Sequence, residues 1–363
     1  MDRDSNVYVF EGQDLEIRVY GPDGELRRRI GRQGEGPGEF RAWPEMGVLG
    51  DTVWTIEAGL GRRITLFSRD GRHLTTSGPI EGVRVAVQSE TMEGVVMPRS
   101  MLPGGSFISD MTTFVGRRDA EPTGVQADDT VLVPRVRFSP SGEVLDTVGY
   151  DVRPPPGPSA PREELTIDGT EFRIPTPPSD RPLSISLTDG RIFVERTVAT
   201  SPDEGIFTVT RLDLARDTAF HRRFRYRPRP YTEAALDTIA LRRARLPSGG
   251  YRIMNGQPVY PDVPGNVDEL RARLREAMSF PAFMPPVGYA HLADDGALWL
   301  QREDDGGDVL PWIVLRPDGS PVGELVLPRR ARVRWSRGET AWVVETDGLD
   351  VPWLVRYRIV EGG

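Results

Sequence analysis

Short apolar runs recur along the chain, and six of them carry an aromatic residue followed three positions later by a charged residue. Each aromatic residue comes three or four positions after a turn residue, which is glycine in five of the six cases. In chain order the pairs are Tyr8 with Glu11, Trp54 with Glu57, Phe107 with Asp110, Phe193 with Arg196, Trp299 with Arg302, and Trp342 with Glu345. One strand cannot bury an aromatic face by itself, so this recurrence predicts copies that stack on one another.

A second recurring pattern is a pair of apolar strands joined by a tight turn. The four turns end at Gly24, Gly71, Gly142 and Gly319. Glycine accepts the positive φ that such turns need near their end. The two patterns together predict units of four antiparallel strands, with the aromatic and charged pair closing the second strand.

Strand-rich units that repeat at about 40–50 residues are typical of propeller blades. The predicted fold class is therefore all-β, a six-bladed β-propeller of four-stranded antiparallel blades, in a single domain over residues 1–363. The intervals between the aromatic residues of blades 3, 4 and 5 are roughly twice as long as the others. These intervals must carry insertions.

The first insertion is rich in proline, with a small hairpin around Asp168 and Gly169. The second, over residues 228–285, predicts a helical insertion between blades 4 and 5. Thr232 can cap its first helix, and Asn266 with Glu269 resembles a capping box for the second. The apolar residues expected on the inner faces of these helices are Leu236, Ile239, Ala240, Leu270, Leu274 and Met278.

Composition narrows the class of protein only in part. The 39 glycines and 33 prolines separate apolar runs rather than forming one tract, which indicates a turn-rich folded chain. Cysteine is absent, so disulfides and thiolate metal sites are excluded and no redox compartment is indicated. No apolar run approaches the length of a membrane-spanning helix, and the polar start at Met1 shows no signal peptide.

The two ends lack strands that a closed ring would need. Blade 1 begins almost at its second strand, and blade 6 offers only the strand-like segments 331–335, 341–345 and 353–360. Unpaired edges are a liability for a sheet protein. We therefore expect residues upstream of Met1, which could carry a secretion signal; an in-frame stop codon directly upstream would contradict this.

The net charge of −8 argues against broad binding to nucleic acids or anionic membranes, so no nucleic-acid partner is expected. Arginine nevertheless clusters in short runs. In residues 223–227 arginine alternates with aromatic residues at the period of a strand. This pattern favours an outer strand with arginines facing water, and RNA binding stays open as an alternative.

Several segments resemble the NHL repeat of bacterial six-bladed propellers. They are Val19 to Leu26, Gly34 to Phe40, Arg63 to Phe67, and the C-terminal stretches beginning at Gly296 and Val355. The resemblance covers roughly residues 1–80 and 285–360. It implies a six-bladed propeller and a secreted or envelope-anchored location, although no lipobox cysteine is present. The wider propeller class includes lactonases, lyases and binding modules, so the fold does not choose a function.

The predicted binding residues are the charged positions that close the second strands, together with one histidine. They are Glu11, Glu57, Asp110, Arg196, Arg302, Glu345 and His291. The six charged positions should lie at one end of the ring, four acidic and two basic, which could form a dipolar binding face. Because the position recurs in every blade, a structural role in tying down loops is the favoured interpretation.

Other candidate groups carry less weight. The three histidines fall on separate parts of the predicted fold, so a three-histidine zinc site is not expected. His291 falls on the innermost strand of blade 5 and could act as a base in the channel, but a lone histidine is more often structural. The acidic stretches 294–295 and 303–308 lack the spacing of a calcium loop. The glycine-rich stretch 31–38 lacks the Lys-Ser/Thr of a phosphate loop.

No catalytic motif or metal-ligand set stands out, so we expect no catalytic residue and no cofactor. The favoured hypothesis is a monomeric, non-enzymatic propeller that binds a protein, peptide or glycan through one ring face and the 228–285 insertion. The alternative is a metal-dependent enzyme of the lactonase or lyase type, with Ca²⁺ or Zn²⁺ held by carboxylates in the central channel.

Overall fold

The structure is a computed structural model of the 363-residue chain. It describes residues 1–57, 62–86, 92–116, 131–153, 163–167, 170–174, 182–196, 199–244, 252–254, 257–259, 267–277, 281–302, 308–329, 331–347 and 351–360. The described residues form an all-β six-bladed propeller of antiparallel blades, with two helices. The chain divides into two compact units, which are Met1–Pro158 with Leu214–Arg216 and Tyr251–Tyr260, and Ser159–Asp213 with Asp217–Gly250 and Pro261–Gly363. Each unit holds three blades.

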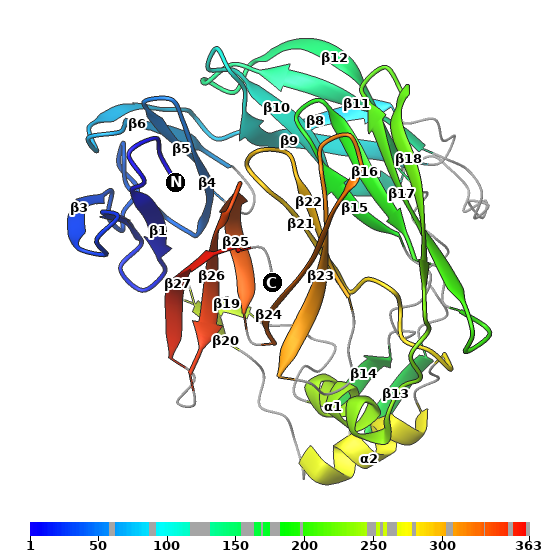
Figure 1. Ribbon diagram of the computed structural model, residues 1–363. Helices are drawn as coiled ribbons and strands as arrows, with labels where there is room; N and C mark the ends of the chain where they lie inside the picture. The colour runs from blue at the N-terminus through cyan, green and yellow to red at the C-terminus, as the bar shows by residue number, and fades with distance from the viewer. Residues whose placement is uncertain are drawn as a thin grey trace. The chain divides into compact units, whose positions relative to one another are not determined.

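The first unit carries blades 1 to 3 (Figure 1). Blade 1 consists of β1 (Val7–Glu11), β2 (Glu16–Tyr20) and β3 (Leu26–Ile30). Blade 2 consists of β4 (Pro44–Leu49), β5 (Thr52–Glu57), β6 (Ile64–Ser68) and β7 (His73–Thr76). Blade 3 consists of β8 (Val83–Ala86), β9 (Met92–Met101), β10 (Phe107–Gly116), β11 (Val131–Phe138) and β12 (Val144–Arg153).

Blade 3 departs from the predicted four strands. Its β9 is ten residues long, and β8 pairs with the first part of it as a fifth strand. Blade 2 has the predicted four strands, in the order β4-β5-β6-β7. Blade 1 has three, and its β1 carries Tyr8, the aromatic residue predicted for a second strand.

Aromatic residues fill the core between neighbouring blades of the first unit. Phe40 is fully buried, with ring centroids 5.4 Å from Phe10 and 5.9 Å from Phe67. Gly31 has a φ of +71°, and a Cβ there would lie 2.3 Å from the Phe40 ring. The buried ring of Phe40 thus fixes the connection from blade 1 to blade 2, and only glycine fits at position 31 beside it.

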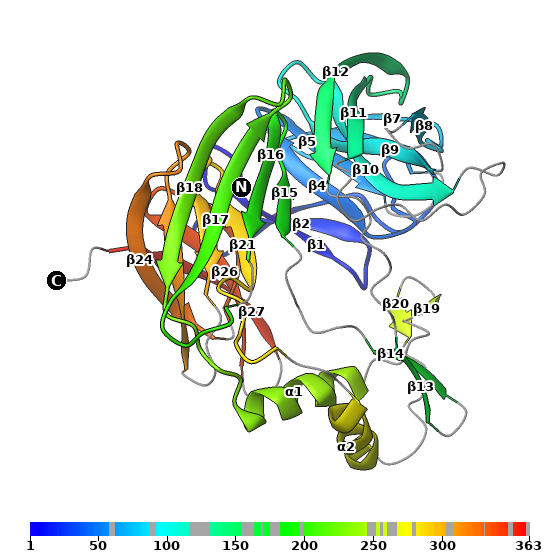
Figure 2. The ribbon, with the colours of Figure 1, turned by 90° about the vertical axis from the view of Figure 1, so that its right-hand side faces the viewer.

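The second unit carries blades 4 to 6. Blade 4 consists of β15 (Leu183–Ser186), β16 (Gly190–Glu195), β17 (Gly205–Asp213) and β18 (Thr218–Tyr226), which run side by side in Figure 2. Blade 5 consists of β21 (Tyr289–Leu292), β22 (Leu298–Gln301), β23 (Val309–Leu315) and β24 (Pro321–Pro328). Blade 6 consists of β25 (Arg332–Arg337), β26 (Thr340–Thr346) and β27 (Pro352–Arg358). Buried clusters join blade 4 to blade 5 and blade 5 to blade 6, with Trp299 and Trp312 in the latter.

The insertion between blades 4 and 5 contains α1 (Glu233–Ala244) and α2 (Val267–Ala277), which lie side by side (Figures 1 and 2). Thr232 caps α1 as predicted, because its Oγ1 accepts a hydrogen bond of 3.2 Å from the amide of Ala235. The predicted inner-face residues Leu236, Ala240, Leu270 and Leu274 are buried. Asn266 and Met278 lie outside the described residues. No helix among the described residues is long and apolar enough to cross a membrane.

Two small hairpins complete the described elements. One pairs β13 (Glu163–Ile167) with β14 (Thr170–Ile174), where the sequence predicted a hairpin in the proline-rich insertion. The other pairs β19 (Arg252–Met254) with β20 (Gln257–Val259), in the part of the sequence that separates α1 from α2, where no strand was expected. Strands of three residues leave too short a pattern for sequence periodicity to detect.

Candidate functional site

The charged residues that close the second strands in the first unit are each held by an arginine of the same blade. The pairs are Glu11 with Arg18 at 3.5 Å, Glu57 with Arg63 at 2.8 Å, and Asp110 with Arg135 at 3.7 Å. Arg18 lies on β2 and Arg135 on β11, each the strand that follows the one carrying the carboxylate, and Arg63 directly precedes β6. This repeated arrangement favours a structural role for the three carboxylates.

Glu57 shows the arrangement at its most buried, with 2% of its surface exposed. Its carboxylate accepts hydrogen bonds of 2.8–3.0 Å from both Arg63 and Arg41. Arg63 also donates to the carbonyls of Glu35 and Glu39, so the network holds the loop between blades 1 and 2. Burial by itself would raise the pKa of Glu57, but the hydrogen bonds from the two arginines outweigh it and hold that pKa below its usual value.

In the second unit, two of the three corresponding positions are also tied down. Arg196 is buried and donates to the carbonyl of Val287 at 3.0 Å. Glu345 accepts a short hydrogen bond from the hydroxyl of Tyr357, which together with burial raises the pKa of that tyrosine to about 12. Arg302 differs, since its guanidinium makes no hydrogen bond or ion pair with any residue that the structure describes.

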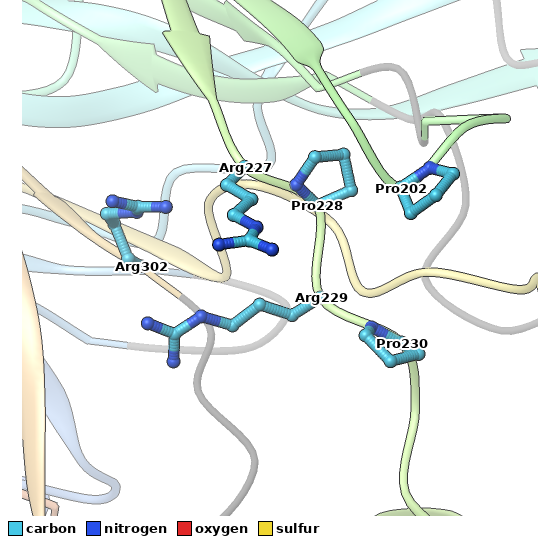
Figure 3. A pocket seen from close by; sticks show the side chains of 6 residues that line it. All are labelled: Pro202, Arg227, Pro228, Arg229, Pro230 and Arg302. Atoms are coloured by element: carbon cyan, nitrogen blue, oxygen red, sulfur yellow. The ribbon is translucent and has the colours of Figure 1, made fainter.

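Arg302 instead lines a pocket of about 530 Å³ between the ends of blades 4 and 5. The lining residues are Pro202, Arg227, Pro228, Arg229, Pro230 and Arg302. In Figure 3 the side chain of Arg229 extends toward the side on which Arg302 lies, and the side chain of Arg227 extends into the space between them. The pocket thus combines three guanidinium groups with proline walls, and none of the described residues that line it is acidic.

The backbone conformation of the segment that carries Arg227 and Arg229 is restricted. Arg227 and Arg229 each precede a proline, which restricts both to extended conformations. The segment is also anchored downstream, because the amide of Met284 donates to the carbonyl of Arg229 at 2.8 Å. In an extended chain, residues two apart point to the same side, so Arg227 and Arg229 present their side chains together.

The charged side chains among the described lining residues of the pocket are all positive. Guanidinium groups stay charged at all physiological pH values, and Arg227, like Arg302, has no hydrogen-bonded or ionic partner within the described part of the chain. Burial raises the pKa of Tyr226, and the positive charge of Arg302 opposes part of this rise. Planar guanidinium forks bind carboxylate, phosphate and sulfate groups in bidentate fashion, so the pocket has the chemistry of an anion site.

His291 lies apart from the residues that line this pocket. Its Nε2 is 3.1 Å from the Oγ of the buried Ser336, and its ring meets Trp299 edge to face at 6.2 Å. Burial lowers the pKa of His291 to about 4, so the ring is neutral near pH 7. These contacts favour a structural histidine between blades 5 and 6.

Replacing His291 by glutamine is expected to flatten the pH dependence of stability in mildly acidic solution. The pKa in the folded state lies below the unfolded value of 6.5, so protonation favours unfolding. The stabilisation by the neutral ring is complete above pH 6.5 and is lost as the pH falls toward about 4, up to roughly 3 kcal/mol. Urea unfolding at pH 7.5 and 4.5 measures this, with the exposed His221→Gln as control; equal pH slopes for wild type and His291→Gln would refute it.

The described acidic residues that were considered as cation ligands contact backbone amides or an arginine instead. Asp295 accepts hydrogen bonds from the amides of Ala297 and Gly338 at 3.2 and 2.7 Å, and Asp294 lies 3.6 Å from Arg337. The acidic residues 303–305 lie outside the described residues. Among the residues that are described, no group of three or more histidine, aspartate or glutamate side chains could hold a metal ion.

Sequence reasoning selected one residue of the pocket and missed its neighbours. Arg302 was among the seven predicted binding residues, whereas Arg227 was interpreted as part of a solvated outer strand. Arg229 was included through the 228–285 insertion, which was expected to contribute to binding. The available signal was the Arg-Pro-Arg-Pro alternation of residues 227–230, which marks an extended segment after the strand has ended. Whether the seven predicted residues bind a ligand stays a prediction.

No family model and no curated protein matches the chain, so the relation to NHL repeats stays a prediction. Among solved structures, a Bacteroides fragilis protein described as exported is 10% identical over 95% of this chain and 78% of its own, with a TM-score of 0.36. The β-propeller domain of the Trilobed protease from Pyrococcus furiosus is 9% identical over 97% and 88%, with a TM-score of 0.32.

A third structure, a Bacteroides fragilis protein described as a 6-phosphogluconolactonase, is 12% identical over 99% of this chain and 97% of its own, with a TM-score of 0.29. Likenesses this distant carry no argument about activity. The assignment of this chain as an all-β six-bladed propeller rests on its own sheets.

Proposed function

We propose that the protein is a non-enzymatic propeller that binds an anionic group of a protein, peptide or glycan ligand in the pocket at Arg302. The proposal rests on Arg302, which differs from the other five recurring charged positions. Five of them contact a partner on a neighbouring strand or loop, whereas Arg302 meets Arg227 and Arg229 around a concave space. A scaffold role repeats from blade to blade, but a binding site needs such asymmetry.

The chemistry of the pocket supports an anion rather than a neutral ligand. Three positive charges gathered in one concavity raise the local potential and attract counter-charge. The adjoining prolines exclude part of the water, which strengthens a guanidinium–oxyanion contact. Their rigid backbone also reduces the entropy lost when a ligand orders the site.

Thermal unfolding with added anions and metal ions tests this function against the alternative. Citrate or pyrophosphate should stabilise the protein beyond sodium chloride of equal ionic strength, because a ligand that binds only the folded state raises its stability. A lactonase- or lyase-like enzyme would instead be stabilised by Ca²⁺ or Zn²⁺ in a manner that a chelator reverses. That second result, with no response to the anions, would replace the proposal by the metal-dependent alternative.

The location and the oligomeric state are further parts of the proposal. The NHL resemblance supports a secreted or envelope-anchored protein, which fractionation of the native host would test. We expect a monomer, and size-exclusion chromatography with light scattering would measure its mass.

A further inference from the structure

Blade 4 ends in an edge strand that carries a row of arginines. In the sheet order β15-β16-β17-β18, β18 is the outermost strand, and no other described strand pairs with its outer edge. Arg223, Arg225, Arg227 and Arg229 are all exposed, while the residues between them are buried or half-buried. Alternate residues of an extended chain lie about 7 Å apart on one side, so the four arginines form an evenly spaced row that runs into the pocket.

The strand that carries the arginine row, β18, is held in place by packing and by strand pairing. On the opposite side of β18, Phe224 stacks on Phe207 with ring centroids 5.0 Å apart, and Phe220 and Tyr226 are buried. The strand pairs continuously with β17 from Tyr226 back to Phe220. The arginines therefore keep their spacing without a ligand, which favours a ligand with the same repeat.

The positive charge of Arg223, Arg225 and Arg227 is largely uncompensated within the described part of the chain. Arg223 and Arg227 have no side-chain partner there, and Arg225 has only Glu204 at 3.3 Å, in a pair whose side chains are 80% and 48% exposed. Such an exposed pair contributes little and is readily exchanged. By contrast, on the arginine-rich strand β3 Arg27 pairs with Asp23 and Arg29 with Glu16.

We infer that β18 binds an extended acidic peptide as an added strand, with acidic side chains at alternate positions facing the arginine row and one of them entering the pocket. An open strand edge offers unpaired amides and carbonyls that an extended peptide can satisfy. Residues directly opposite on neighbouring strands have Cβ atoms about 5 Å apart, within reach of arginine–carboxylate pairs. The inference rests on the proposed function, because the pocket forms the end of the row.

The same features favour a peptide over a nucleic acid. The regular backbone hydrogen bonds offered along a strand edge are matched by the backbone of an extended polypeptide. Single-stranded nucleic acids are usually bound by stacking bases on exposed aromatic rings, whereas the aromatic residues of β18 point to the buried side. A net charge of −8 also disfavours a long polyanion.

Fluorescence anisotropy with three labelled probes tests the inference on the full chain. The probes are a nonapeptide alternating glutamate and threonine, a nonapeptide of the same composition with its glutamates consecutive, and a thymidine 12-mer. We expect the alternating peptide to bind at least about tenfold more tightly than the consecutive one, because only it places every carboxylate on the arginine side. Equal affinities for the two peptides would overturn the inference.

Arginine variants test whether the alternating peptide binds along β18. Arg223→Gln with Arg225→Gln should weaken the alternating peptide at least about tenfold and leave stabilisation by citrate intact, since neither residue lines the pocket. Arg356→Gln with Arg358→Gln, also exposed at alternate positions of the outer strand β27, is the matched control and should change nothing. An unchanged affinity in the first variant would overturn the inference.

The remaining outcomes separate this inference from the proposed function. Tighter binding of the thymidine 12-mer, dependent on Arg223 and Arg225, would overturn the peptide in favour of a nucleic acid. Citrate stabilisation without a preference for the alternating peptide would leave the pocket as an anion site and refute only the strand. No response to citrate and none to any probe would refute both.

Discussion

Replacing Glu57 by glutamine is expected to lower the free energy of unfolding by about 3–5 kcal/mol at pH 7. The carboxylate is buried with only 2% of its surface exposed, and Arg63 beside it is also buried. Removing the negative charge leaves a buried guanidinium without its counter-ion, which is far costlier than losing an exposed pair. The same change would release the loop that Arg63 and Arg41 hold between blades 1 and 2.

The pH dependence of this effect has a definite sign. Since the pKa of Glu57 is lowered in the folded state, its stabilisation is present above the usual glutamate pKa and is lost as the pH falls through the folded value. The difference between wild type and Glu57→Gln should therefore shrink in acid. A variant that keeps the difference constant down to acidic pH would contradict the assigned ion network.

Chemical unfolding of matched variants measures the effect. Glu45→Gln is the control, because Glu45 pairs with Arg99 at the surface and should cost less than about 1 kcal/mol. In a double-mutant cycle, Glu57→Gln and Arg63→Met should together cost less than the sum of the two single changes. If Glu57→Gln costs no more than Glu45→Gln, Glu57 is not a structural residue and returns to the set of candidate binding groups.

The second large effect concerns the pocket. Citrate at about one hundred times its dissociation constant is expected to stabilise the wild-type protein by about 2.7 kcal/mol, and Arg302→Gln should abolish most of this. Arg302 is one of three guanidinium groups that line the pocket and has no counter-ion among the described residues. Without citrate, Arg302→Gln should be as stable as wild type or slightly more so, because it relieves repulsion among like charges.

Differential scanning calorimetry in citrate and in sodium chloride of equal ionic strength provides the measurement. Arg334→Gln is the control, since Arg334 is exposed on β25 and does not line the pocket. Both wild type and this control should respond to citrate alike. A citrate response that survives in Arg302→Gln would place the anion elsewhere.

The blade architecture could be predicted from the sequence because its signals are local. Turn glycines, aromatic residues and strand alternation lie within a few positions of one another, and Thr232 marks the start of α1 in the same way. The fifth strand of blade 3 was not predicted because β8 has only four residues. It pairs with β9, which is long enough to hold a further strand. Pairing of this kind depends on tertiary structure rather than on local preference.

The candidate site could be predicted only in part, for a similar reason. The sequence marks Arg302 and Glu57 as equivalent charged positions, but it does not show that one is buried against two arginines while the other has no counter-ion. The pocket arises where the segment after β18 approaches the end of β22, far apart in the chain. Only the fold brings Arg227 and Arg229 next to Arg302.

The most direct test of the central claim is a crystal structure of the protein soaked with tungstate, whose metal atom is located by its anomalous scattering. We predict an oxyanion within hydrogen-bonding distance of at least two of the guanidinium groups of Arg227, Arg229 and Arg302. Tungstate bound only elsewhere, with this pocket holding none, would contradict the claim that the protein binds anionic ligands here.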